Sequence, residues 1–461
     1  MSKKKPKQKN KLNFLFFDQK GRRSIILMSL LVLVIKLFVI MALPEHAWPG
    51  ADARSYLLGT NAIIENGIFT KNSLLLYFPA GYSIIVWLFS RITATNVLMV
   101  IAIIQSITFF FSAVFFAEKI RQTRLTKMAF ALAFILAVNP TLSLSSMVVG
   151  YENLAASFFL LSIGLIIHTQ LNPSNKTLWK TLPLVAGLQS ISAFMQPRLL
   201  LISFSLFLIW GLRFTSRKTG TLILVFGIAI TLILPAGEVI RNIKANDMAV
   251  ISTNLGTTMN IGVGDHATGG YQSTINKIVG VPCDPKPSAK IVSDGQRITC
   301  VLGWYVANPI RTLHLSLNKS IYFWSPWYGP LAEGTMARNP WVKVNPIRNI
   351  AQSSPGGYKL VYGWVGKTIS WLWLLGGLTL MFIGFVWIWR KGELERLIAM
   401  LALTPIILAW ITSIATIGDH RFRVPTMGVS LFLQVAGAVA LKIKFMKTAG
   451  LSALEPKASA R

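Results

Sequence analysis

Long apolar runs recur through the whole chain, and they restrict what it can fold into more than any other feature. Runs of about 17 to 25 residues are each long enough to cross roughly 30 Å of hydrocarbon as a helix. The 461 residues are 53% hydrophobic and only 13% charged, a composition that water-soluble domains of this size do not have. The sequence therefore predicts an all-α polytopic membrane protein.

The positions of the short basic loops decide how the spans are counted. Residues 80–91 are apolar but only twelve long. If they crossed the membrane, the basic loop at 119–127 would lie outside, against the positive-inside rule. We therefore predict that 50–67 and 80–91 form external juxtamembrane helices after the first span. About ten transmembrane helices follow, within a range of 10–13: 24–43, 95–117, 127–147, 152–169, 179–195, 198–213, 219–237, 364–389, 396–416 and 424–443.

This topology places both termini in the cytoplasm and divides the chain into five parts. They are a basic cytoplasmic tail (1–23), a transmembrane catalytic region (24–237), a long external or periplasmic segment of mixed, partly ordered structure (238–363), C-terminal transmembrane helices (364–443) and a cytoplasmic tail (444–461). The net charge of +30 lies mostly in loops and tails beside spans, where it sets orientation. We therefore expect a membrane partner and no nucleic acid.

Charged residues gather at the external ends of the predicted spans. A carboxylate near hydrocarbon costs roughly 2.5 kcal/mol or more unless it is paired or hydrated, so such residues are functional candidates. Acids and cations on one side indicate a wet cavity just outside the bilayer, where Arg and Lys can hold a phosphate and a carboxylate can act as general base. The residues are Asp52, Glu152, Arg198, Lys319, Asp419, His420 and Arg421.

Simpler roles remain open for several of these residues. Asp52 could serve as the N-cap of the helix at 50–67, and Glu152 could complement the positive end of its own span. Arg198 and Lys319 could extend to lipid phosphates. Lys36 lies within the first span, so it must either extend to the surface or face protein.

The sequence gives weaker evidence for a metal site or for thiol chemistry. No cluster of His, Cys and acidic residues has metal-ligand spacing, and neither a P-loop nor a GxSxG nucleophile elbow is present. We therefore predict no metal site from side-chain spacing, while a divalent cation stays open as a cofactor. The only two cysteines, Cys283 and Cys300, lie in the external segment. Outside the cytoplasm they are expected to form a disulfide, with two free thiols as the alternative.

Seven short motifs occur in a fixed order along most of the chain. They are Asp52-Ala-Arg-Ser-Tyr56 with Glu65-Asn-Gly67; Phe78-Pro-Ala-Gly-Tyr82; Tyr151-Glu152-Asn153; Gln196-Pro-Arg198; Ser252-Thr-Asn-Leu-Gly256 with Ala267-Thr-Gly-Gly-Tyr271; Asn308-Pro309 with Lys319 and Phe323-Trp324; and Arg421-Phe-Arg-Val-Pro425. In this order they resemble the membrane-embedded glycosyltransferases of the GT-C superfamily. The closest resemblance is to the family 39 branch, which contains protein O-mannosyltransferases and lipid A aminoarabinose transferases. The sequence departs from the motif pattern of this family at Ala80, Gly264 and Asp419.

The resemblance implies an inverting transfer of a sugar from a polyprenyl-phosphate donor to a lipid, glycan or protein acceptor. The reaction would take place on the external face of the cytoplasmic (inner) membrane. By carry-over of the motifs, Asp52 would be the catalytic base and Glu152 would orient donor or acceptor. The departing phosphate would be held by Arg198, Lys319 and Arg421. The wider substrate-binding set would add Arg54, Tyr56, His266 and His420.

Two other functions remain as alternatives. A flippase or transporter of a lipid-linked saccharide would share the basic outer cavity, and a surface-polysaccharide polymerase or ligase would share the chemistry. A transporter also needs polar residues deep inside several spans. Such residues are few here, namely Lys36, Gln105, Asn139 and Gln189, which favours the enzyme.

Overall fold

The computed structural model describes residues 19–42, 48–49, 52–93, 95–139, 141–214, 216–264, 267–270, 293–324, 355–356 and 364–448. Helices account for nearly all of the regular structure in these ranges. The α-helices are α1 (Gln19–Ala42), α2 (Ala53–Asn66), α3 (Ser73–Tyr77), α4 (Ala80–Ser90), α5 (Val97–Arg121), α6 (Ala129–Val138), α7 (Glu152–Leu171), α8 (Asn175–Met195), α9 (Leu200–Leu212), α10 (Arg217–Thr231), α11 (Ile233–Asn246), α12 (Leu255–Ile261), α13 (Asp294–Ala307), α14 (Pro309–Trp324), α17 (Trp364–Trp389), α18 (Glu393–Ala415) and α19 (Val424–Thr448).

Short elements complete the described fold. Two strands of two residues each, β1 (Trp48–Pro49) and β2 (Val148–Val149), pair in parallel. The 3₁₀ turns are η1 (Thr126–Met128), η2 (Leu144–Met147), η3 (Pro197–Leu199) and η4 (His420–Arg423). The predicted all-α class is confirmed.

Six helical stretches in the described part of the chain are long and apolar enough to cross a membrane. They are Gly21–Ala42, Val97–Arg121, Glu152–Leu171, Arg217–Asn246, Glu393–Ala415 and His420–Met446. Shorter apolar helices cover Ala80–Ser90, Thr126–Val138, Pro197–Leu212 and Leu374–Trp389. The prediction of a polytopic membrane protein is confirmed, while the division into ten spans and five parts stays a prediction.

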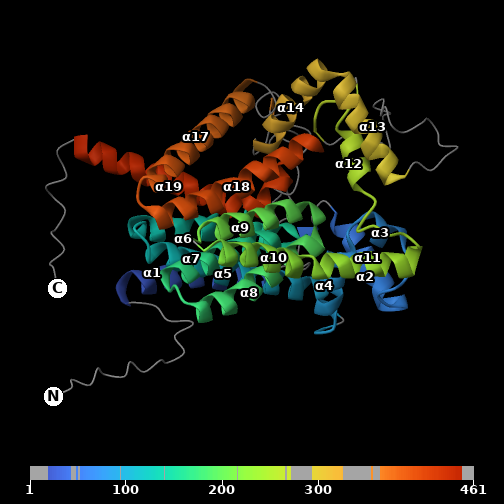
Figure 1. Cartoon of the computed structure of the whole chain (residues 1–461), viewed down its shortest axis with the longest axis horizontal. Helices are drawn as coiled ribbons and strands as arrows, with labels where there is room; N and C mark the ends of the chain where they lie inside the picture. Colours follow the sequence, from blue (N-terminus) through green and yellow to red (C-terminus); the bar gives the residue numbers. More distant parts are fainter. Residues whose placement is uncertain are drawn as a thin grey trace.

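Several short helices lie at one end of the bundle (Figure 1). Figure 1 shows α2, α3 and α12 beyond one end of the long helices, while the C-terminal part of α19 extends at the opposite end. The apolar helix α4 packs against α2, α5 and α8. Its eleven residues span about 16 Å at 1.5 Å per residue, which is too short to cross. Helices are thus present within 50–67 and 80–91 as α2 and α4, while their position at the membrane surface stays a prediction.

The helix that begins with the predicted span 219–237 continues further than expected. It breaks after α10 at Leu232 and resumes as α11, which runs to Asn246. Pro235 explains the break, because proline lacks an N–H and fits in a first helical turn. The second half of α11 fastens the loop before α3: Arg241 donates to the carbonyls of Ile68 at 3.0 Å, Thr70 at 2.8 Å and Leu75 at 3.3 Å.

Close contact between glycines joins the C-terminal helices. A Cβ at Gly384 of α17 would collide with the carbonyl of Leu433, and a Cβ at Gly437 of α19 would collide with that of Leu380. Small residues let two helix backbones approach in this way within a membrane. Helix α19 also packs on α7 and α18, so this contact connects α17 to the remainder of the bundle.

Helices α12 and α13 form a separate small hydrophobic cluster. Met259, Val263 and Val301 are buried together between α12 and α13. Helix α14 follows α13 and covers Pro309–Trp324. Its last residues reach the bundle, where the Trp324 ring lies edge-on to Trp410 at 5.9 Å between centroids.

Candidate active site

The two short strands bring distant acids together. In the parallel register, Trp48 pairs with Val148 and Pro49 with Val149. Asp52 follows β1 by three residues, and Glu152 follows β2 by three residues. Because the strands run in the same direction, the segments that follow them place Asp52 and Glu152 at the same end of the strand pair. The pairing therefore positions two carboxylates that are a hundred residues apart in the sequence.

The carboxylate of Asp52 does not cap its helix. Asp52 occupies the N-cap position of α2, yet its side chain makes no capping hydrogen bond. Instead its Oδ2 accepts a hydrogen bond from Nη1 of Arg421 at 2.6 Å. The side chain of Asp52 remains 26% exposed. The carboxylate is thus held by a cation and still reachable from outside, which the capping alternative does not explain.

Arg421 lies between three carboxylates. Its Nε is 3.4 Å from Oε1 of Glu152 and 3.9 Å from Oδ2 of Asp419. Its backbone N–H donates to Oδ1 of Asp419 at 2.9 Å, which starts the turn η4. A guanidinium offers five N–H donors in a fixed fork, so one side chain can hold several carboxylates at once. Arg421 therefore connects the loop after α18 to both acids.

Glu152 is the first residue of α7 and is 8% exposed. A carboxylate at this position complements the positive end of the helix, so the structural role considered from the sequence applies as well. A Cβ at Gly150 would collide with the Glu152 carboxylate. Glycine at 150 thus leaves room for the Glu152 carboxylate in the position it occupies.

Arg198 reaches the same site through aromatic side chains. Its Nη2 donates to the hydroxyl of Tyr151 at 3.0 Å. Its Cζ lies 3.6 Å from the ring centroid of Phe422, and the Cζ of Arg421 lies 5.6 Å from that centroid. The two guanidinium groups therefore lie near one aromatic ring, a cation–π arrangement that holds them near each other despite their like charge.

Tyr56 supports the site from α2. It is 3% exposed, and its ring contacts Phe78 at 5.8 Å and Tyr82 at 4.9 Å between centroids, both edge-on. Burial first, and then the charges of Asp52 and Glu152, raise the pKa of its phenol well above the usual value. The hydroxyl thus stays protonated beside the acids. Arg54, on the same helix, is exposed.

Lys319 lies in a neighbouring position and contacts different groups. It is 1% exposed, and its Nζ donates to the hydroxyl of Tyr305 at 2.9 Å and to the carbonyl of Ile414 at 3.0 Å. Tyr305 in turn donates to the carbonyl of Ala415 at 3.1 Å. These carbonyls belong to the last turn of α18, where a cation is favourable. Lys319 therefore holds the end of the helix that leads to Arg421.

A backbone contact also fixes the segment that connects α18 to Arg421. Gly418 donates its N–H to the carbonyl of Gly269 at 2.8 Å, and Gly418 pairs with Gly270 in an isolated bridge. A Cβ at Gly418 would lie 2.6 Å from Cα of Lys319. Gly269 has φ +94°, a conformation that favours glycine. The Gly-rich segment at 267–270 thus packs against the turn before Asp419.

The remaining predicted site residues divide into two groups. His420 is described: it is 2% exposed, its Nδ1 is 3.9 Å from Oδ1 of Asp419, and its Nε2 has no hydrogen-bond partner. His266 and Cys283 lie outside the described residues, while Cys300 is on α13. The predicted disulfide therefore stays a prediction.

The described residues do not form a cation site in this arrangement. Within them, no group of three or more His, Cys, Asp or Glu side chains could hold a metal ion. Arg421 already pairs with Asp52, Glu152 and Asp419.

Sequence reasoning missed the part played by aromatic residues. Tyr151 and Phe422 each lie next to a predicted charged residue in the chain, and they contact Arg198. Tyr305 is the partner of Lys319. The adjacent motif positions were a usable signal for the first two. Tyr305 belongs to no motif, and its contact depends on how α13 and α14 fold back on α18.

Comparison with known proteins gives matches among solved structures alone. No protein-family model and no curated protein matches the chain. The archaeal oligosaccharyltransferase AglB from Archaeoglobus fulgidus, in complex with an inhibitory peptide and a dolichol-phosphate, is similar at 14% identity and a TM-score of 0.46. The match covers 94% of this chain and 52% of that one.

Two further structures of the Archaeoglobus fulgidus oligosaccharyltransferase are similar to the same degree. One is tethered to an acceptor peptide, with 14% identity and a TM-score of 0.47, and one is a complex with Zn and sulfate, with 13% identity and a TM-score of 0.46. Each match covers 94% of this chain and 51% of the other. The chain thus spans about half the length of these oligosaccharyltransferases.

Proposed function

We propose that this chain is a membrane glycosyltransferase that moves a sugar from a polyprenyl-phosphate donor to an acceptor at the outer face of the cytoplasmic membrane. The observation that carries the proposal is the state of Asp52. Its carboxylate makes no capping hydrogen bond to α2, lies 2.6 Å from the Arg421 guanidinium and is partly exposed. A carboxylate paired with a cation at the end of a helix bundle is suited to deprotonate an incoming acceptor.

The reaction would proceed as a single displacement. The acceptor hydroxyl gives its proton to Asp52 as its oxygen attacks the anomeric carbon of the sugar. The bond from that carbon to the phosphate oxygen breaks on the opposite face, which inverts the configuration. The electron pair of the broken bond leaves with the polyprenyl phosphate, and Asp52 later releases the proton to water.

The cations would act on the leaving phosphate. Negative charge grows on the phosphate in the transition state, and positioned guanidinium groups stabilise such charge most when they are held in place beforehand. Arg198 and Arg421 are held beside the Phe422 ring. Glu152, 3.4 Å from Arg421, would orient the donor or the acceptor. Lys319 would act indirectly, because its ammonium is bonded to the end of α18.

A transporter function finds less support in the deep polar residues. Lys36 and Gln105 donate to groups of the loop before α7. Gln189 donates to Ser162 at 2.8 Å and accepts from Ser203 at 2.9 Å. These side chains are engaged within the protein, so they leave little to line a polar path across the membrane.

Replacement of Asp52 tests the proposal directly. The purified protein in liposomes is incubated with a polyprenyl-phosphate sugar and a membrane lipid extract, and the products are followed by mass spectrometry. Asp52→Asn should lower transfer about 100-fold or more, as expected for loss of a general base, with an unchanged melting temperature. Glu65→Gln is the control, because Glu65 is an exposed acid on the same helix.

Three outcomes separate the candidate functions. Transfer at the wild-type rate by Asp52→Asn would show that Asp52 is not the base. Movement of the donor across the bilayer without a change in its mass would identify a transporter. Consumption of a pyrophosphate-linked oligosaccharide, in place of the phosphate-linked sugar, would identify a polymerase or ligase.

A further inference from the structure

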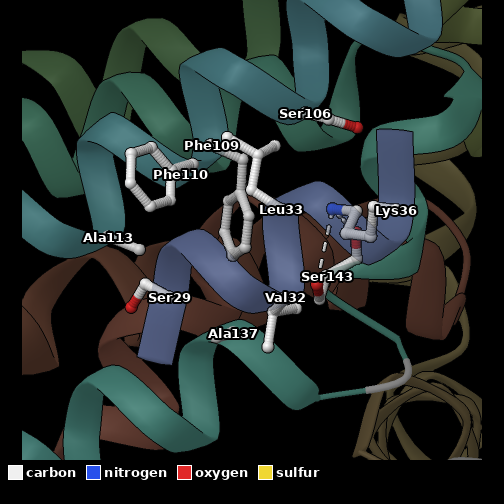
Figure 2. A pocket seen from close by; sticks show the side chains of 10 residues that line it. All are labelled: Ser29, Val32, Leu33, Lys36, Ser106, Phe109, Phe110, Ala113, Ala137 and Ser143. Carbon is white, nitrogen blue, oxygen red and sulfur yellow. Dashed lines mark hydrogen bonds between the residues drawn. The ribbon is translucent and has the colours of Figure 1, made fainter. Parts of the chain in front are cut away.

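Lys36 is a buried cation that the proposed chemistry does not use. It lies in the middle of α1, is 5% exposed, and faces protein instead of extending to the surface. Its Nζ donates to the carbonyl of Ser143 at 2.7 Å and to the hydroxyl of Ser146 at 2.5 Å. Figure 2 shows the side chain pointing from α1 toward Ser143, with Phe109 alongside.

The crevice beside Lys36 is too small to be a ligand site. Its lining is mostly apolar, with Val32, Leu33, Phe109 and Phe110 around it (Figure 2). Its volume of about 20 Å³ is room for little more than one water molecule. An ammonium has three donors, and those of Lys36 have acceptors on two serines. The charge therefore acts on the protein itself.

The acceptors of Lys36 belong to the segment that leads to Glu152. Ser143 and Ser146 lie in residues 141–149, which connect α6 to α7 through η2 and β2. Helix α5 holds the same segment: Gln105 donates from Nε2 to the carbonyls of Ser146 at 3.0 Å and Val148 at 2.9 Å. Two membrane helices thus hold one external loop by its backbone.

A further chain of hydrogen bonds extends from this loop to the acid. The hydroxyl of Tyr82 in α4 donates to Oε1 of Gln105 at 3.1 Å and accepts the N–H of Gly150 at 2.9 Å. Gly150 is two residues before Glu152 and lies against its carboxylate. Polar side chains from α1, α4 and α5 therefore contact successive parts of the segment from 143 to 150.

We propose that Lys36, together with Gln105 and Tyr82, is a positioning residue that holds the 143–150 segment so that Glu152 faces Arg421. A charge inside a membrane helix costs roughly 2.5 kcal/mol or more, and an apolar side chain would fill the same space. The compensation is a set of charge-assisted hydrogen bonds to backbone and hydroxyl groups, which fix the loop. The inference rests on the proposed function, because it gives Glu152 a part in the transfer.

Hydrogen exchange tests the positioning without any assay of activity. Lys36→Met keeps the length of the side chain and removes the donors. Amide exchange in the peptide covering 143–152 should become about tenfold faster or more, since hydrogen bonds to charged groups contribute about 1.5–3 kcal/mol. Exchange in α18 should not change. Lys119→Met is the matched control. Lys119 also lies over a phenylalanine ring, that of Phe115, near the C-terminal end of α5.

Kinetics then connect the loop to the reaction. For Lys36→Met we expect kcat for sugar transfer to fall about 10- to 100-fold, the range for a misplaced reacting group, while KM for the donor changes less than twofold. Tyr82→Phe, which removes one hydroxyl, should lower kcat in the same direction. The kcat of the double variant should be little lower than that of the less active single variant, because both changes release the same loop.

The results distinguish this inference from the proposed function. Unchanged exchange at 143–152 in both Lys36→Met and Tyr82→Phe would overturn the positioning role. Faster exchange with unchanged kcat would overturn it as well, because the loop would not bear on transfer. A wild-type protein that transfers no sugar would contradict the proposed function alone, and exchange would still decide whether Lys36 holds the loop.

Discussion

Arg421 shows how a single residue can organise charges that come from distant parts of the chain. Two carboxylates in a partly buried site repel each other, and a cation between them reduces that repulsion. Arg421 contacts Asp52 and Glu152 with different nitrogens of one guanidinium. A lysine is a point charge without this fork, so it could not hold both acids in the same way.

Lys319 gives the site a predictable response to pH. Burial lowers the pKa of its ammonium from 10.5 to about 7, while burial raises the pKa of the neighbouring Tyr305 to about 12. Between pH 7 and 10.5 the unfolded chain binds a proton at this lysine that the folded chain does not. Stability must therefore rise with pH through this window, and Tyr305 stays protonated throughout it.

The measurement is the melting temperature of the detergent-solubilised protein at pH 6.5 and pH 9. We expect the wild type to melt higher at pH 9, and Lys319→Met to lose most of that difference. Lys244→Met, a change at an exposed lysine of α11, should keep the wild-type difference. Equal pH dependence in wild type and Lys319→Met would show that Lys319 is not the group responsible.

At the scale of elements, the contact between α17 and α19 depends on absent side chains. Gly384 and Gly437 lie where any Cβ would strike a carbonyl of the other helix. Because these carbonyls belong to helix backbones, neither helix can yield by rotating a side chain. The two helices would have to separate.

Gly437→Ala should therefore destabilise the protein by about 1–3 kcal/mol, the usual cost of overpacking. Gly376→Ala is the control within α17, because a Cβ there meets nothing within 4 Å, and alanine in an open helical position is neutral or stabilising by about 0.5–1 kcal/mol. Thermal or denaturant unfolding in detergent measures both. A Gly437→Ala variant as stable as Gly376→Ala would mean that the helices are not in close contact.

The sequence predicted elements better than contacts. Apolar runs and basic loops indicated the helices, α2 and α4 among them, because length and charge are local properties. The helix break at Leu232, which Pro235 explains, lies inside the predicted span 219–237, and α11 continues beyond the predicted end to Asn246. The close approach at Gly437 could not be predicted, since glycine in an apolar run gives no indication of what lies opposite.

At the scale of the whole molecule, convergence of the site depends on pairings between distant segments. Motif order predicted that Asp52, Glu152, Arg198 and Arg421 belong together, and the fold brings these four into one cluster through β1–β2 and the Phe422 ring. The motif order did not predict that Lys319 would bind the end of α18. That contact is set by the packing of α13 and α14 against α18, which no local pattern encodes.

A density map of the protein with a bound polyprenyl phosphate tests the central claim most directly. We predict the phosphate within about 3 Å of the guanidinium nitrogens of Arg198 or Arg421, with the carboxylate of Asp52 facing the space beside it. A phosphate bound at a distance from both arginines, with Asp52 still closed onto Arg421, would contradict the proposed site.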